Sequence, residues 1–100
     1  MRNDILFFPI ITSTEDELGQ IEEIEEYSRK AFCERRSIPQ NEFFQAGLSG
    51  IKASQILIVD ILDYQDEVKV KYRNKIYRIY RTYEKSDEEI ELYCEVRADG

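Results

Sequence analysis

The sequence predicts a mainly β protein, a small antiparallel β-barrel or sandwich with one long loop. Three observations lead to this prediction. Residues 68–72 alternate strictly between apolar and polar, and two further strand-like segments follow across short turns. Residues 55–62 form an almost wholly apolar run, as in a strand buried on both faces or covered partly by a neighbouring subunit. The length of 100 residues suits a single domain, residues 1–100.

The N-terminal third begins with an apolar, aromatic segment at residues 4–11, which predicts a strand. Pro9 favours an edge position there, because proline donates no ladder hydrogen bond. Residues 12–20 are polar and read as a loop or hairpin connection. Residues 20–27 leave two alternatives open. Apolar residues recur there every three positions, as in a helix, but the flanking segments resemble strands.

Residues 38–54 form the predicted long loop. Within it, Asn41 can cap a short helix that carries Glu42 in its first turn. Gly47 and Gly50 would then break that helix. A loop of this length in a compact domain is usually functional, so we expect it to be mobile in the free protein.

The C-terminal third predicts a meander of three antiparallel strands. The first is residues 68–72, and Asn74 suits the tight turn that follows it. Residues 76–83 are rich in aromatic and β-branched side chains, and residues 90–96 alternate again. Strict alternation would place four side chains of the middle strand on one face: Tyr77, Ile79, Arg81 and Tyr83.

The charges are unevenly distributed. The net charge is −7, which argues against tight sequence-independent binding of duplex DNA. Residues 15–26 contain seven acids and no base, whereas residues 69–85 contain seven bases and one acid. Such a dipolar chain can meet copies of itself head to tail, and head-to-tail contacts generate rings when the rotation closes. The candidate charged interface comprises Glu22, Glu23, Glu25, Glu26, Arg78 and Arg81.

Candidate catalytic and metal-binding groups are few. The sequence has no histidine, which excludes the familiar catalytic constellations that need one. Cys33 and Cys94 lie far apart and predict two small buried hydrophobic residues rather than a disulfide or a zinc site. A cluster of acids, Asp60, Asp63, Asp66 and Glu67, lacks the spacing of a calcium loop, and its segment Asp63-Tyr-Gln-Asp66 suits a turn better. We therefore expect no metal, no cofactor and no enzymatic activity.

Aromatic and basic residues interleave between residues 71 and 83, which raises an alternative function. Such strands can form a stacking platform in a small β-barrel that binds single-stranded nucleic acid. The tyrosines divide between the two faces of the predicted strands, however, and this division favours a packing role.

The order of several segments resembles the head–tail joining proteins of tailed bacteriophages and prophages, which are also called head closure, stopper or adaptor proteins. The resemblance spans nearly the whole chain. The segments that carry it are Asp16-Glu-Leu-Gly-Gln20, Phe32-Cys-Glu34, Glu42-Phe-Phe-Gln-Ala-Gly47, Tyr72-Arg-Asn-Lys-Ile-Tyr-Arg-Ile-Tyr80 and Glu91-Leu-Tyr-Cys94. Residues 20–26 are more acidic here than is usual in this family.

The resemblance implies a small β-barrel, with residues 20–27 as strand and a long loop between the second and third strands. It implies a structural connector in the virion, assembled in the bacterial host cytoplasm without membrane association. Such subunits form a ring, commonly of twelve copies, between the portal or adaptor ring and the tail. The ring extends the DNA channel and retains packaged DNA without specific binding. The candidate channel-lining and interface residues in the loop are Glu42, Phe43, Phe44, Ala46, Gly47 and Gly50.

Overall fold

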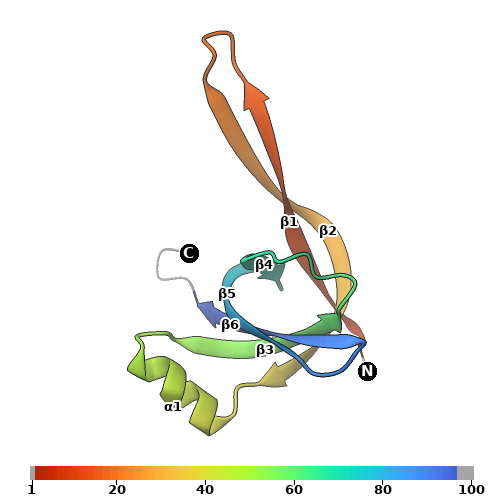
Figure 1. The fold of residues 1–100 in the computed structure, drawn as a ribbon, viewed down its shortest axis with the longest axis vertical. Helices are drawn as coiled ribbons and strands as arrows, with labels where there is room; N and C mark the ends of the chain where they lie inside the picture. The colour runs from red at the N-terminus through yellow and green to blue at the C-terminus, as the bar shows by residue number, and fades with distance from the viewer. Residues whose placement is uncertain (1, 97–100) are drawn as a thin grey trace.

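The computed structural model describes residues 2–96 as a closed six-stranded antiparallel barrel with one helix at its side (Figure 1). Around the barrel the strands follow the order β1-β2-β3-β6-β5-β4. The predicted mainly β class and the C-terminal meander are confirmed. The elements are β1 (Asp4–Glu15), β2 (Ile21–Ser37), α1 (Gln40–Leu48), β3 (Ala53–Asp60), β4 (Lys69–Tyr72), β5 (Lys75–Glu84) and β6 (Glu89–Val96).

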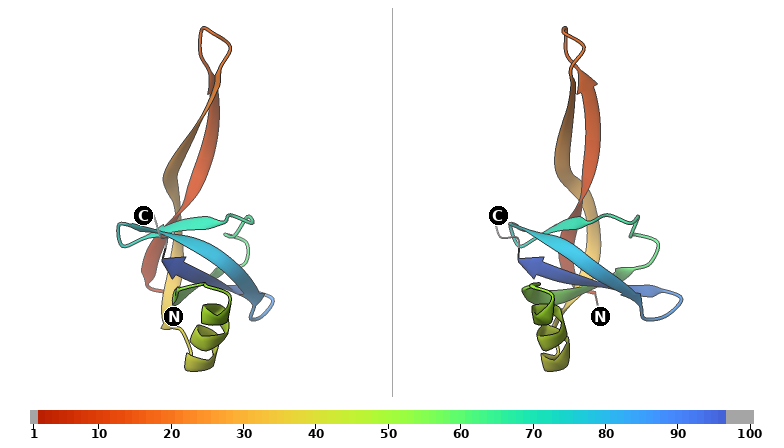
Figure 2. Two further views of the ribbon diagram at one scale, coloured as in Figure 1. Left: turned by 90° about the vertical axis from the view of Figure 1, so that its left-hand side faces the viewer. Right: turned by 60° about the vertical axis from the view of Figure 1, so that its left-hand side comes forward.

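The hairpin of β1 and β2 is much longer than the barrel. The two strands pair from Asp4 and Cys33 at the base to Glu15 and Ile21 at the tip. However, β4 pairs with β1 at Phe7, and β3 pairs with β2 from Cys33 onward. The outer part of the hairpin, residues 9–27, therefore projects from the barrel as a two-stranded arm (Figures 1 and 2).

The arm decides the question that the sequence left open at residues 20–27. These residues lie in β2 from Ile21 onward, so the helical alternative is wrong and the strand is confirmed. The loop predicted at residues 12–20 is also shorter than expected, because β1 continues to Glu15. The remaining turn is organised by Asp16, whose Oδ1 accepts hydrogen bonds from the amides of Leu18 at 2.9 Å and Gln20 at 2.8 Å.

A β-bulge marks the point where the arm leaves the barrel. The register shifts between Phe8 and Pro9, because Phe8 faces Arg29 whereas Pro9 faces Tyr27. Ser28 is thus the extra residue on β2. Proline is tolerated at bulges and free edges, since its missing N–H leaves no ladder bond unmade. The edge position predicted for Pro9 agrees with this site.

The barrel interior is filled by aliphatic and aromatic side chains from every strand. Cys33 and Cys94 lie among them, fully buried and free. Removal from water raises the pKa of each thiol to about 12. The prediction of two buried, unpaired small hydrophobic residues is confirmed. The core consists of Leu6, Phe8, Ala31, Cys33, Leu57, Val59, Val70, Tyr72, Ile79, Ile90, Leu92 and Cys94.

Replacing Cys33 or Cys94 by serine is expected to lower the free energy of unfolding by about 1–3 kcal/mol, because each hydroxyl would be buried among apolar neighbours. The matched alanine variants add no polar group and separate the loss of packing from the cost of the hydroxyl. Urea denaturation measures both. A serine variant as stable as the wild-type protein would contradict the burial described here.

Strand β3 is buried on both faces within a single chain. Leu57 and Val59 point into the barrel, whereas Ile56 and Ile58 join an outer cluster with Tyr93. This arrangement confirms the first of the two explanations for the apolar run at residues 55–62. The strand ends at Asp60, however, and Leu62 lies in the following turn, 84% exposed.

The alternation predicted for β5 is interrupted by a second bulge. Ile79 faces Cys94 and Arg81 faces Tyr93, so Tyr80 is the extra residue. Ile79 belongs to the barrel core, whereas Tyr80 and Arg81 both contact Tyr93 outside it. The prediction that Ile79 and Arg81 share a face is therefore wrong. The turn before β5 is confirmed, with Asn74 at φ 65°.

Candidate interaction surfaces

Helix α1 occupies the segment that the sequence predicted as a long loop. It starts after Pro39, so Asn41 lies inside the helix and does not cap it. Gly47 is also inside the helix, contrary to the prediction that it breaks the helix. The break comes at Gly50, whose φ of 77° suits glycine, and the amide of Ile51 donates to the Ala46 carbonyl at 2.9 Å.

Four side chains, which we call the latch, hold α1 against the barrel. Arg81 donates to the Glu42 carboxylate at 2.5 Å and 3.2 Å, and the Tyr80 hydroxyl donates to it at 2.8 Å. The Arg81 guanidinium also lies 3.7 Å from the centre of the Tyr93 ring, and Tyr80 packs edge-on against that ring. The bulge at Tyr80 makes this possible, because it turns two consecutive side chains toward α1.

The latch shifts the ionisation of its members in opposite directions. Hydrogen bonds from Arg81 lower the pKa of Glu42, with a smaller contribution from Tyr80. Burial, followed by the bond to Glu42, raises the pKa of the Tyr80 hydroxyl. Both shifts favour a charged Glu42 and a neutral Tyr80. At neutral pH the latch is therefore closed.

Acidification is expected to release the latch. The folded-state pKa of Glu42 lies below its ordinary value of 4.5, so its stabilising contribution is complete above that value and is lost as the pH falls through the lower one. Near-ultraviolet circular dichroism follows the packing of Tyr80 and Tyr93 during such a titration. Glu42→Gln is the matched variant, because it has no charge to lose. An acid transition of equal size in this variant would contradict the assignment.

The outer side of α1 presents three large apolar side chains to solvent. Phe43 is 49% exposed, Phe44 is 62% exposed and Leu48 is 83% exposed. We call these three residues the helix patch. Ala46 is the only buried residue of α1. Both phenylalanines therefore lie outside the core.

The arm carries the acidic candidate residues on both of its faces. The β1–β2 register places Glu23 and Glu25 on one face and Glu22 and Glu26 on the other, all four exposed. Glu25 contacts Lys69 of the same chain, with 3.3 Å between Oε2 and Nζ. No ion pair of the other three is found among residues 2–96.

Apolar side chains of the arm are also exposed, and the sequence did not single them out as candidates. Ile11 is 61% exposed and Ile21 is 73% exposed, and Leu18 at the turn is 84% exposed. Of these three, only Ile21 belongs to the spacing that suggested a helix at residues 20–27. These side chains follow neither helical nor alternating spacing, because neither face of the arm packs on a core.

The two basic candidates are engaged within the chain. Arg81 belongs to the latch, and the Nε atom of Arg78 lies 2.5 Å from Oε1 of Glu95. The structure therefore does not bring Arg78 and Arg81 together with the acidic arm. Other basic side chains of the β4–β5 hairpin form fewer ion pairs. Lys71 and Lys75 have no ion pair among the described residues.

The base of the arm is anchored by Arg29. Its guanidinium lies 4.6 Å from the centre of the Phe8 ring, and its Nη1 donates to the Asp63 carbonyl at 2.7 Å. It also pairs with Glu67, whose backbone carbonyl accepts from the Tyr64 hydroxyl. The connection between β3 and β4 is thereby fixed to the foot of the arm.

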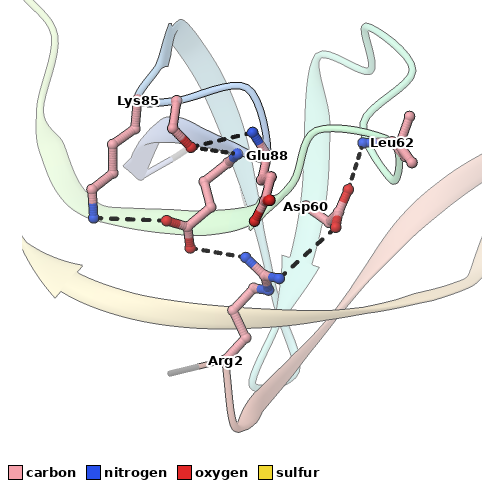
Figure 3. A network of polar contacts seen from close by, with 7 residues as sticks. Arg2, Asp60, Leu62, Lys85 and Glu88 are labelled. Atoms are coloured by element: carbon pink, nitrogen blue, oxygen red, sulfur yellow. Dashed lines mark hydrogen bonds and ion pairs between the residues drawn. The ribbon is translucent and has the colours of Figure 1, made fainter.

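The acidic cluster predicted as a turn has structural partners. Asp60 accepts from the amide of Leu62 at 2.9 Å and lies 3.8 Å from Arg2 (Figure 3). Arg2 also pairs with Glu89 at 2.8 Å, so it ties the start of β1 to the turns that follow β3 and β5. No group of three or more metal-ligating side chains is found between residues 2 and 96.

The tyrosines of the alternative nucleic-acid platform are largely occupied. Tyr72 is buried and donates to Asp4, and Tyr80 belongs to the latch. Tyr77 packs against the barrel core, whereas Tyr83 is 56% exposed. A stacking surface of successive exposed rings is not formed by these four residues. No helix in the described part of the chain is long and apolar enough to cross a membrane.

Taken together, these features define a small closed β-barrel with a latched helix and a projecting acidic arm. No family model and no curated protein matches the sequence. Among solved structures, a chain of the structure described as "Virion of native gene transfer agent (GTA) particle" matches with a TM-score of 0.55. The match covers 95% of this chain and 94% of that chain at 10% identity. The two chains therefore share a fold along nearly their whole lengths.

Proposed function

We propose that this chain is a structural subunit of a phage-like virion, and specifically a head–tail connector. The observation that carries the proposal is the fold shared end to end with a chain of a gene transfer agent virion. The resemblance of segment order to head–tail joining proteins supports the narrower role. In that role, copies form a ring between the portal or adaptor ring and the tail, and the ring extends the channel for DNA.

The distribution of exposed side chains supports a role in assembly. The helix patch and the arm both expose large apolar groups, and such groups gain burial when neighbours arrive. We assign the helix patch, with the exposed Gly47 and Gly50 beside it, to the channel lining or to contact with a neighbouring ring. Glu42 and Ala46 are not part of this surface, because Glu42 is held in the latch and Ala46 is buried. The arm is assigned to contacts between subunits. The negative net charge would let DNA pass without adhering.

Deletion of the gene in the genome that encodes this chain tests the proposal. Electron microscopy should then show heads without tails, or heads that have lost their DNA, and the wild-type gene should restore complete particles. Mass spectrometry should detect the chain in purified particles from the wild-type strain. Normal tailed, DNA-filled particles from the deletion strain, or absence of the chain from particles, would refute the connector role.

A further inference from the structure

We infer that the arm of one copy binds the basic β4–β5 hairpin of a second copy of this chain. The receiving surface, which we call the basic hairpin, comprises Lys71, Arg73 and Lys75. The inference rests on the proposed function only for the place of this contact in a ring. The contact itself follows from the charges and the exposure of the two surfaces.

The arm pairs with no third strand of its own chain, although Glu25 at its base contacts Lys69. Beyond Phe8, β1 has no described partner on its outer edge, and β2 has none there before Cys33. A two-stranded hairpin alone is marginally stable in water, and open edges invite further contacts. Ile11 and Ile21 are more than half exposed, so a partner surface would remove them from water.

A second arm cannot be that partner. The segment from Glu15 to Glu26 holds seven acids and no base. Pairing two arms would place glutamates against glutamates on both faces, and like charges directly opposite destabilise a sheet. The arm therefore requires a basic partner.

The basic hairpin offers charge and apolar surface together. Lys71 and Arg73 line a cleft at the side of the barrel with Ile5, Phe7 and Tyr27, the last of which is the residue at the base of the arm. The Arg73 side chain is 68% exposed although it pairs with Asp4, and Lys75 is exposed. This mixture of bases and apolar groups complements the mixture of glutamates and isoleucines on the arm.

The geometry makes the contact one between copies. The base of the arm lies beside the basic hairpin of the same chain at Tyr27, but the arm points away from the barrel in every view, so its tip cannot reach that hairpin (Figure 2). The two surfaces that meet are different, which defines a heterologous contact. Repeated heterologous contacts generate a ring when the rotation closes.

Two complementary charge reversals test this contact. The first variant carries Glu22→Lys, Glu23→Lys and Glu26→Lys on the arm, and it spares Glu25 with its internal partner. The second carries Lys71→Glu and Lys75→Glu on the basic hairpin. Each variant alone would oppose like charges across the contact. A mixture of the two would oppose unlike charges at every contact, and so would one chain that carries both sets.

Sedimentation velocity over a concentration series measures the result. We expect weak self-association of the wild-type protein that strengthens at low salt, where the Debye length grows from about 10 Å at 0.1 M to about 30 Å at 0.01 M. Each reversal alone should weaken it about tenfold or more, and the mixture and the combined variant should restore it. Loss without restoration, retention in either single variant, or no association of the wild-type protein would overturn the inference.

Zero-length carbodiimide coupling of carboxylates to lysines supplies an independent readout. A mixture of unlabelled and ¹⁵N-labelled wild-type chains should give mixed-isotope links from Glu22, Glu23 or Glu26 to Lys71 or Lys75. The link between Glu25 and Lys69 should form within one chain, and it serves as the internal control. If cross-links from Glu22, Glu23 or Glu26 formed only within single chains, the inferred contact between copies would be wrong. Because these assays need no particle, their outcome is independent of the gene-deletion test.

Discussion

Replacing Phe43 and Phe44 together by serine is expected to leave a folded barrel but to yield particles that lose DNA or lack tails. Phe43 is 49% exposed and Phe44 is 62% exposed, so the substitution removes little packing, and exposed substitutions usually change stability by no more than about 0.5 kcal/mol each. An apolar pair on a helix is a typical anchor in an interface. Urea denaturation measures the fold, and electron microscopy of particles measures the function.

A matched double variant controls for the loss of exposed apolar surface in general. Phe32 is 54% exposed and Leu62 is 84% exposed, and both lie outside the helix patch and the arm. Serine at these two positions should leave particle assembly intact. Unfolding caused by the Phe43 and Phe44 substitutions, or normal particles from that variant, would refute the assignment of the helix patch.

Phe8→Ala is expected to have the largest effect on stability, a loss of about 3–5 kcal/mol from a total of about 5–15 kcal/mol. Phe8 is fully buried, packs against Tyr64 and lies under the Arg29 guanidinium. Its removal opens a cavity at the point where the arm joins the barrel. Urea denaturation measures the loss, and Phe32→Ala is the control at an exposed phenylalanine. Equal effects of the two substitutions would contradict the role of Phe8.

The sequence predicted those parts of the fold in which one face of a strand is buried. The alternation of apolar and polar residues predicted the strands of the meander. Asn74, which tolerates a positive φ, predicted the turn before β5. Both bulges escaped prediction, because one inserted residue reverses every later side chain without changing the composition. The arm was ambiguous for a different reason. Neither of its faces packs on a core, so no burial imposes a period on Ile21 and Ile24.

The candidate surfaces were predicted in part. Phe43 and Phe44 were named as candidate interface residues from the segment in which they lie, and both are exposed in the structure. The partner of Glu42 was not predictable, because Arg81 lies 39 residues away and reaches it only through the bulge at Tyr80. Contacts of this kind depend on tertiary structure that local pattern does not encode. The sequence therefore identified Glu42 as a residue of interest but not its role in the latch.

The bulge at Phe8 and Pro9 has a mechanical consequence. At about 3.4 Å per residue, the strand from Pro9 to Glu15 extends about 20 Å beyond this bulge. A rotation of about 10° there moves the tip by about 3.5 Å, one residue of strand. A small change of angle at the bulge would thus become a displacement of a whole residue at the tip. Such a rotation would change where the tip of the arm lies by several ångströms without any repacking of the barrel interior.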